Sequence, residues 1–319
     1  MPLVSSLYRP SLFLRNGHLA TIYAGLVRKV PDVRQKRERI ELSDGDFLDL
    51  DWSYGFQKNE QLVILLHGLE GNAQRPYIAG SANLFNHNGF DVCAINFRGC
   101  SGEPNTLYRS YHSGATEDLR EVVQHILNTK IYSKIYLKGF SLGGNLLLKY
   151  LGETNNVPKE IKAAVAVSVP CDLGESAKEI MKPKNVLYAT RFKKNLLAKL
   201  RHKQILFPDL VKDSDLVTIK TLLDFDDFYT SQAHGFKDGL DYYTKCSSRQ
   251  FLQNITVPSL IINAKDDSFL GEACYPFEEA DKNSNLYLEV PKYGGHVGFW
   301  GKKNITYTEK RALEFFTST

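Results

Sequence analysis

Ser141 stands between two glycines in the stretch "GFSLG" (residues 139–143), where a strand-like run gives way to a helix-like run. The segment "KIYLKGF" is rich in β-forming residues and alternates, whereas "LLLKYLGE" has the apolar density of a buried helix. A serine on so sharp a turn adopts strained dihedral angles that lift its hydroxyl clear of the sheet, and glycines let the neighbouring elements approach closely. The pattern predicts a nucleophilic serine.

A serine hydroxyl is a weak nucleophile unless a base activates it and an acid orients that base. His296 is our candidate base, because it follows the last strand-like run in the glycine-flanked segment "KYGGHVGFW". The preceding run, "VPSLIINAKDDSF", contains Asp266 and Asp267 just after its apolar part, and either carboxylate could hold the imidazole. The chain order serine, aspartate, histidine is one of the orders in which such triads occur.

Two backbone N–H groups are candidates for stabilising the negative charge that an attacked carbonyl develops. Leu142 directly follows the serine, at the start of the predicted helix, where N–H groups have no helical partner. Leu69 lies in "HGLEGN", where Gly68 and Gly71 let the loop curl toward the same point. We expect Leu69 and Leu142 to form an oxyanion hole, and His67 to orient the first loop by hydrogen bonding.

Strand-like and helix-like segments alternate along most of the chain, which predicts a mostly parallel sheet flanked by helices, an α/β fold. The strand-like runs are "LVILLHG", "FDVCAINFRG", "KIYLKGF", "IKAAVAVSVP", "PSLIINA" and "NLYLEV". Before them, the pattern around Asp44-Gly45 predicts an antiparallel hairpin. We expect a single domain over residues 1–319, opened by an irregular N-terminal arm (residues 1–36) that packs on the core.

The alternation breaks once, at residues 171–256, which are too many for an ordinary connection. Apolar residues at intervals of four, from Tyr188 through Phe192 and Leu196 to Leu200, predict an amphipathic helix there. We therefore expect an inserted helical lid over one end of the sheet.

Eight Lys or Arg residues and no acidic residue lie between Lys182 and Lys203, within the predicted lid. Such a run could attract an acidic head group, a coenzyme A phosphate or a membrane surface, so peripheral membrane contact through the basic lid is one hypothesis. We favour the simpler interpretation, a solvated face of the lid.

Other polar features keep two interpretations. "FRGCSGEP" (residues 97–104) could border the pocket or form a structural turn, and Arg98 would pair with a carboxylate in either case. His18 and His112 could line the site, but we favour packing roles for both.

Several blocks of the sequence together resemble the YheT-like branch of the AB hydrolase superfamily, also called the AB hydrolase 4 family. The blocks are "NGHLAT", "SDGDFLDLDW", "HGLEG", "NFRGCSGEPN", "YHSGATEDL", "GFSLGGN", "NAKDDSF" and "GGHVGF". The resemblance implies the α/β-hydrolase fold, with the charge relay on Ser141, Asp267 and His296. It also implies hydrolysis of carboxylic esters, with short- or medium-chain acyl esters as common substrates, and acyl transfer to alcohols in some members.

We therefore expect a serine esterase that forms an acyl-enzyme intermediate with a small-molecule acyl ester. Two alternatives remain: an alcohol acyltransferase that uses the same triad, and a non-catalytic binding protein on the same scaffold. A dry pocket with a second apolar channel would favour the acyltransferase. Failure of an organophosphonate to label Ser141 would favour the binding protein.

Composition excludes other classes of function. The net charge of +4, from 40 basic and 36 acidic residues, is too mild to indicate nucleic-acid binding. The histidines are dispersed, so we expect no metal, and we expect no cofactor. Five scattered cysteines are typical of reduced thiols, and no run approaches the length of a membrane span. We therefore expect a cytoplasmic protein without an integral membrane segment.

Overall fold

The computed structural model describes residues 3–56 and 59–319, and over these ranges nine strands form one sheet of order β1-β9-β8-β7-β6-β4-β5-β3-β2. The strands are β1 (Leu3–Val4), β2 (Lys36–Glu41), β3 (Phe47–Ser53), β4 (Gln61–Leu66), β5 (Asp91–Asn96), β6 (Lys134–Phe140), β7 (Ile161–Val167), β8 (Ser259–Ile262) and β9 (Leu286–Glu289). In this order, neighbouring strands are parallel from β1 through β9, β8, β7, β6 and β4 to β5. Strand β3 pairs antiparallel with both β5 and β2. The predicted parallel sheet and its opening hairpin are confirmed.

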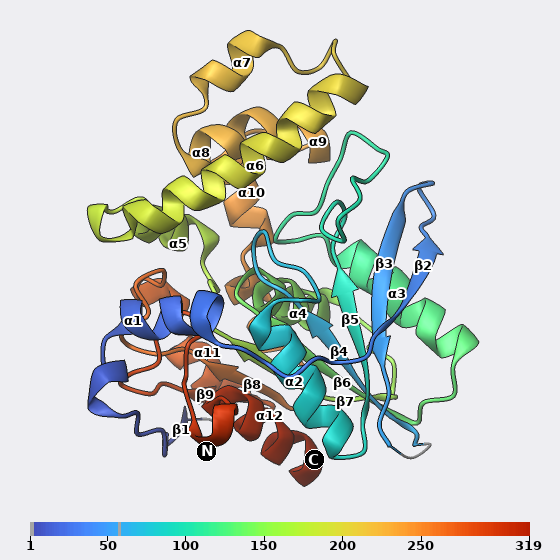
Figure 1. The fold of residues 1–319 in the computed structure, drawn as a ribbon, viewed down its shortest axis with the longest axis vertical. Helices are drawn as coiled ribbons and strands as arrows, with labels where there is room; N and C mark the ends of the chain where they lie inside the picture. The colour runs from blue at the N-terminus through green and yellow to red at the C-terminus, as the bar shows by residue number, and fades with distance from the viewer. Residues whose placement is uncertain (1–2, 57–58) are drawn as a thin grey trace.

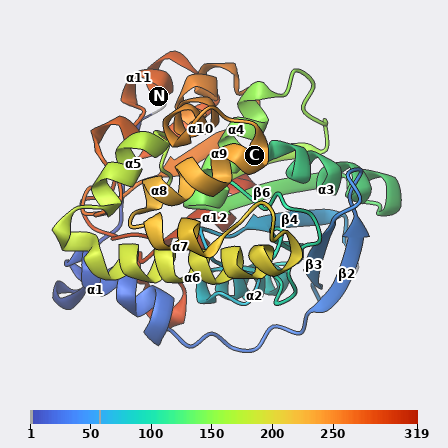
Figure 2. The same ribbon diagram turned by 90° about the horizontal axis from the view of Figure 1, so that it is seen from above.

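Helices cover both faces of this sheet (Figures 1 and 2). One face packs against α2 (Pro76–His87) and α12 (Tyr307–Ser318), and the other against α3 (Thr116–Thr129), α4 (Leu142–Glu153) and α11 (Phe277–Lys282). Because both faces are covered, the central strands are apolar along their length, and all residues from Leu62 to Leu66 are fully buried. This rigid sheet fixes the positions of the loops that follow its strands.

The segment between β7 and β8 forms a helical layer above the sheet, in yellow and orange in Figure 1. Its helices are α5 (Leu173–Ile180), α6 (Val186–Leu206), α7 (Asp213–Thr218), α8 (Leu222–Phe225), α9 (Ser231–His234) and α10 (Gly239–Cys246). The predicted amphipathic helix is α6, whose Leu196 and Leu200 pack with Leu222 and Phe225 in a core separate from those of the sheet. We call residues 171–256 the helical insertion.

The N-terminal arm runs along the front of the molecule in Figure 1. Leu3 pairs with Leu288 across β1 and β9, and α1 (Gly17–Ile22) follows, with its N-terminus capped by the Asn16 side chain. Farther along, Arg28 forms a buried ion pair with Glu309 of α12, at 2.7 Å. Strand pairing and a buried ion pair therefore hold the arm against the rest of the domain.

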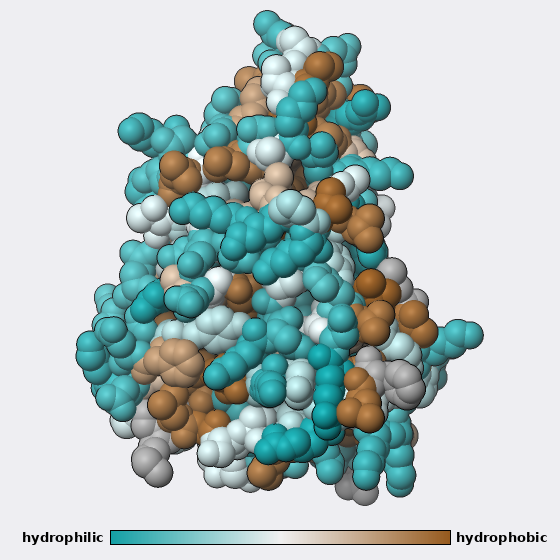
Figure 3. Space-filling model, turned by 90° about the vertical axis from the view of Figure 1, so that its left-hand side faces the viewer, coloured by the Kyte–Doolittle hydropathy of each residue, from teal (hydrophilic) through white to brown (hydrophobic). Residues whose placement is uncertain are grey.

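The surface shown in Figure 3 is mainly hydrophilic, with hydrophobic side chains in small separate groups. Exposed large apolar residues belong mostly to the arm and the helical insertion, among them Leu7, Leu12, Leu187 and Ile205. Within the described ranges, no helix combines the length and the apolar character that a bilayer crossing requires.

Candidate active site

Ser141 occupies the turn between β6 and α4. Its dihedral angles, φ 52° and ψ −119°, lie in a region that costs a non-glycine residue free energy. Glycines make room for the turn, since a Cβ on Gly139 would stand 2.4 Å from the Gly143 carbonyl oxygen and one on Gly143 would stand 2.5 Å from that of His67. The strand, the helix and the loop after β4 therefore meet at the serine.

The side chains of Ser141, His296 and Asp267 form a continuous hydrogen-bonded series. Ser141 Oγ lies 2.9 Å from His296 Nε2, and His296 Nδ1 lies 2.8 Å from Asp267 Oδ2. The other carboxylate oxygen, Oδ1, accepts the backbone N–H of Phe269 at 3.0 Å, and the Asp267 side chain is fully buried. With the proton on Nδ1, Nε2 can accept the serine proton, which is the arrangement that general-base catalysis requires.

Asp266, the other candidate acid, binds a different group. Its Oδ1 accepts the backbone N–H of Gly295 at 2.8 Å, and its Oδ2 is buried without a hydrogen-bond partner among the described residues. Burial raises the pKa of this carboxyl group, and the charge of Asp267 raises it further. Asp267 therefore contacts the imidazole, whereas Asp266 contacts the loop that carries it.

Distant segments hold the loop that carries His296. The His296 N–H donates to Thr21 Oγ1 of α1 at 2.8 Å, and the next N–H, of Val297, donates to Ser168 Oγ at 2.9 Å. The ring of Phe269 lies 4.3 Å from the imidazole, measured between centroids. The N-terminal arm thus helps to position His296, a role that the sequence did not indicate.

The predicted oxyanion donors both lie next to Ser141. A Cβ on Gly68 would stand 3.2 Å from the Ser141 Cβ, so the loop that carries Leu69 touches the serine. Among the described residues, the Leu69 N–H donates to no protein group, and the Leu142 N–H is the first of α4 and has no helical partner. Both N–H groups can therefore bind an oxygen of a ligand.

His67 fixes the loop of Leu69, as the sequence suggested. Its Nδ1 lies 2.8 Å from the Gly68 carbonyl oxygen and therefore donates, while its Nε2 accepts the N–H of Phe97 at 3.2 Å. Burial lowers the pKa of this imidazole to about 3. A histidine that stays neutral in this way orients the loop and takes no part in proton transfer near neutral pH.

Two cavities meet at Ser141, and both are also bordered by Leu69 and His296. The first cavity, of about 250 Å³, is lined largely by apolar residues of the helical insertion, including Leu173, Ile180, Leu196, Leu200, Phe225 and Tyr229. The second cavity, of about 150 Å³, lies between the N-terminal arm and α6 and is lined by Thr21, Ile22, Gly25, Tyr188, Arg191 and Asn195, among others. A ligand bound at Ser141 can therefore extend in two directions with different surroundings.

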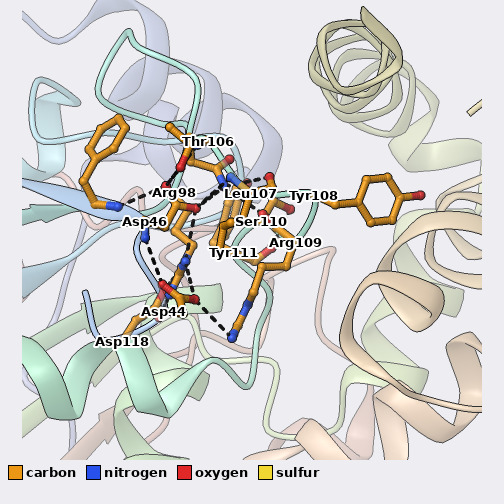
Figure 4. Close-up of polar contacts among 12 residues, drawn as sticks. Asp44, Asp46, Arg98, Thr106, Leu107, Tyr108, Arg109, Ser110, Tyr111 and Asp118 are labelled. Carbon is orange, nitrogen blue, oxygen red and sulfur yellow. Dashed lines mark hydrogen bonds and ion pairs between the residues drawn. The ribbon is translucent and has the colours of Figure 1, made fainter. Parts of the chain in front are cut away.

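A buried ion-pair network holds the loop after β5 beside the first cavity (Figure 4). The Arg98 guanidinium lies 2.7 Å from Asp118 Oδ1, 2.9 Å from Asp44 Oδ2 and 3.2 Å from Asp46 Oδ2. Residues 97–104 thus form a structural turn and also border the pocket, so both interpretations of this segment hold.

The basic run on α6 is not a uniform solvated face. Lys199 Nζ lies 2.9 Å from Glu70 Oε1, and Lys203 Nζ lies 2.9 Å from the Asn105 carbonyl oxygen. Burial lowers the pKa of Lys203 to about 8. The sequence reasoning missed both contacts, although each lysine follows an apolar position of the predicted stripe by seven residues, a spacing that indicates the buried side of a helix.

Two other histidines lie away from the serine hydroxyl. His18 stacks on Tyr188 of α6 with ring centroids 5.8 Å apart, which is a packing role. His112 borders the first cavity with its ring 4.3 Å from that of His234, and burial lowers its pKa to about 3.

Known proteins resemble this chain over most of its length. A family model described as the alpha/beta hydrolase fold matches residues 61–303. YheT of Escherichia coli K12, named as a candidate esterase, is 35% identical over 303 residues, which cover 93% of this chain and 88% of that protein. The human phospholipase ABHD3 is 30% identical over 329 residues, which cover 98% of this chain and 79% of that protein.

Solved structures have a similar overall fold. An esterase of Pyrococcus furiosus superposes with a TM-score of 0.61 at 19% identity, covering 90% of this chain and 91% of that one. At this identity the match concerns the fold.

Proposed function

This chain belongs to the YheT-like branch of the alpha/beta hydrolase family, and we propose that it is a serine hydrolase that cleaves carboxylic esters through an acyl-enzyme intermediate. The observation that carries the proposal is the series from Ser141 Oγ to His296 Nε2 and from Nδ1 to Asp267, with separations of 2.9 and 2.8 Å. Relatives named as an esterase and a phospholipase support ester cleavage as the reaction class.

In the acylation half-reaction, Ser141 Oγ bonds to the ester carbonyl carbon while His296 Nε2 takes the hydroxyl proton. The Asp267 carboxylate stabilises the imidazolium, and the N–H groups of Leu69 and Leu142 bind the oxyanion. The bond between the carbonyl carbon and the alcohol oxygen then breaks, and His296 returns its proton to the leaving alcohol. The acyl group stays on Ser141.

In the deacylation half-reaction, water attacks the acyl carbon and gives a proton to His296. The same two N–H groups bind the second oxyanion, and its collapse releases the carboxylic acid as the proton returns to Ser141.

We infer that the two cavities hold the two ends of the substrate. The apolar first cavity takes the acyl chain, because burying methylene groups against leucine and phenylalanine side chains is favourable. The second cavity takes the alcohol part, and the helical insertion acts as the lid over the site. A short- or medium-chain acyl group fits a cavity of about 250 Å³.

Acyl transfer to an alcohol is the second candidate function, and the second cavity is the observation that favours it. A space of about 150 Å³ beside Ser141 can hold an acceptor alcohol in place of water. Adding butanol to the assay distinguishes the two, since a transferase forms the butyl ester in preference to the free acid. The intact hydrogen-bonded series favours catalysis over a non-catalytic binding role.

The proposed function is tested by hydrolysis of p-nitrophenyl esters from acetate to palmitate. We expect turnover by the natural chain to be greatest with short or medium acyl groups, and Ser141→Ala to lower kcat by about 10³-fold or more. Ser133→Ala, an exposed serine before β6, is the matched control and keeps full activity. Equal turnover by Ser141→Ala and the natural chain would contradict the proposal.

A further inference from the structure

Glu70 follows the Leu69 oxyanion donor and has an unusual backbone conformation. Its φ of 54° lies in the left-handed region, which a non-glycine residue adopts only when its surroundings impose it. Its N–H donates to the Tyr111 hydroxyl at 2.9 Å, and its carbonyl oxygen accepts from Arg75 Nη2 at 2.7 Å. The chain directly after Leu69 is therefore clamped through Glu70.

The preceding peptide is fixed as well. The Gly68 carbonyl oxygen accepts from His67 Nδ1 at 2.8 Å and from the Gly71 N–H at 2.9 Å. Because a trans peptide is planar, fixing this oxygen fixes the direction of the Leu69 N–H on the opposite side of the same peptide. Glu70 anchors the other end of Leu69, so its contacts decide how firmly the donor is held.

The Glu70 side chain connects this loop to the helical insertion. Its carboxylate is buried, and Oε1 accepts from the Tyr111 hydroxyl at 2.6 Å and from Lys199 Nζ of α6 at 2.9 Å. The ammonium also lies 3.0 Å from Cys100 Sγ and 5.0 Å from the centre of the Tyr111 ring. The Lys199 side chain is 35% exposed, whereas the Glu70 carboxylate is buried. Removing the ammonium therefore leaves a buried carboxylate without its charged partner, which weakens the anchoring of the loop.

We propose that Lys199 is a positioning residue that acts through Glu70 to hold the Leu69 N–H in the oxyanion hole, an inference that rests on the proposed function. The hole is then fully formed only when α6 is seated on the core. Lys203, one turn farther along α6, anchors the same helix to Asn105 and Leu107, which belong to a different loop. Comparing substitutions of the two lysines therefore distinguishes an effect of how α6 packs from an effect on the Leu69 N–H.

The test compares Lys199→Met with Lys203→Met and with Lys194→Met, an exposed lysine of the same helix, using p-nitrophenyl acetate. We expect Lys199→Met to lower kcat by about 10- to 100-fold with little change in KM, a part of what one oxyanion donor contributes. Affinity for a trifluoromethyl ketone, whose adduct with Ser141 carries an oxyanion, falls by the same factor. Lys194→Met leaves both quantities unchanged. Lys203→Met lowers kcat less than Lys199→Met does, because it loosens one anchor of α6 but leaves the contact between Lys199 and Glu70 in place.

A double-substitution cycle tests whether Lys199 acts through Glu70. Glu70→Ala lowers kcat. Adding Lys199→Met to Glu70→Ala causes no further loss of kcat, because the contact between Lys199 and Glu70 is already absent. Lys199→Arg, which keeps the charge, restores most of kcat. Thermal unfolding checks each variant, and Lys199→Gln replaces Lys199→Met if the latter does not fold.

Two failures are distinguishable. If Ser141→Ala retains the turnover of the natural chain, the proposed function fails and the positioning role fails with it. If turnover depends on Ser141 but Lys199→Met matches Lys194→Met in kcat, or its loss adds in full to that of Glu70→Ala, only the positioning role is overturned.

Discussion

Two adjacent aspartates illustrate what single residues contribute to this site. Asp266 and Asp267 follow the same strand and have the same chemistry, so residue type alone did not choose between them, and only the family resemblance placed the acid on Asp267. The structure separates them by their partners, since Asp267 Oδ2 lies 2.8 Å from His296 Nδ1 while Asp266 Oδ1 accepts the Gly295 N–H. One carboxylate can stabilise an imidazolium, and the other supports the loop.

We predict that Asp267→Asn and Asp266→Asn differ sharply in kcat. Asp267→Asn presents an amide to Nδ1 and favours the wrong tautomer of His296, so kcat falls by about 10³- to 10⁴-fold. In Asp266→Asn the amide oxygen still accepts the Gly295 N–H, so kcat stays within about tenfold. The measurement is steady-state hydrolysis of p-nitrophenyl butyrate by both variants, and the reverse order of losses would show that the acid is misassigned.

The sequence predicted the helices and strands that follow a regular hydrophobic period or flank a recognisable turn. The strands around Ser141 and the long helix α6 follow from alternation and from the i+4 repeat of apolar residues. The hairpin between β2 and β3 follows from Asp44-Gly45, and Gly45 has a φ of 84°.

Elements of the N-terminal arm could not be predicted in this way. The helix α1 has six residues and β1 has two, which are too short for a periodic pattern. They are stabilised by residues far along the chain, as when Thr21 accepts the N–H of His296 and Leu3 pairs with Leu288. The partner of Lys199 was unpredictable for the same reason, because Glu70 lies in a loop 129 positions earlier.

In the part of the chain that the structure describes, the imidazoles of His67 and His112 are buried and that of His234 is partly buried, and this makes the stability of the protein depend on pH. Burial lowers the pKa of His67 and of His112 to about 3, and that of His234 to about 2. A histidine of the unfolded chain titrates near about pH 6.5, so below that pH the unfolded state binds protons that the folded state does not. The stability associated with these neutral imidazoles is therefore fully present above about pH 6.5. The free energy of unfolding then decreases as the pH falls from about 6.5 toward about 3.

We predict that His112→Asn removes the part of the pH dependence of the free energy of unfolding that comes from His112. Asp226, whose pKa is raised to about 6 by burial, acts in the opposite direction, so the variant is compared with the natural chain at each pH. The free energy of unfolding, measured with urea between about pH 7 and pH 4.5, should fall less steeply for the variant, by up to about 1.4 kcal/mol per pH unit below pH 6. Parallel curves would contradict a neutral, buried His112.

We propose that Ser141 is the nucleophile of an acyl-enzyme mechanism, and labelling with a fluorophosphonate followed by mass spectrometry of the peptides tests this claim. The reagent bonds to an activated serine and loses fluoride, so we predict one adduct per chain, on the peptide that contains Ser141, and slow labelling in Asp267→Asn. A chain that remains unlabelled, or one labelled at another serine with Ser141 free, would contradict the claim.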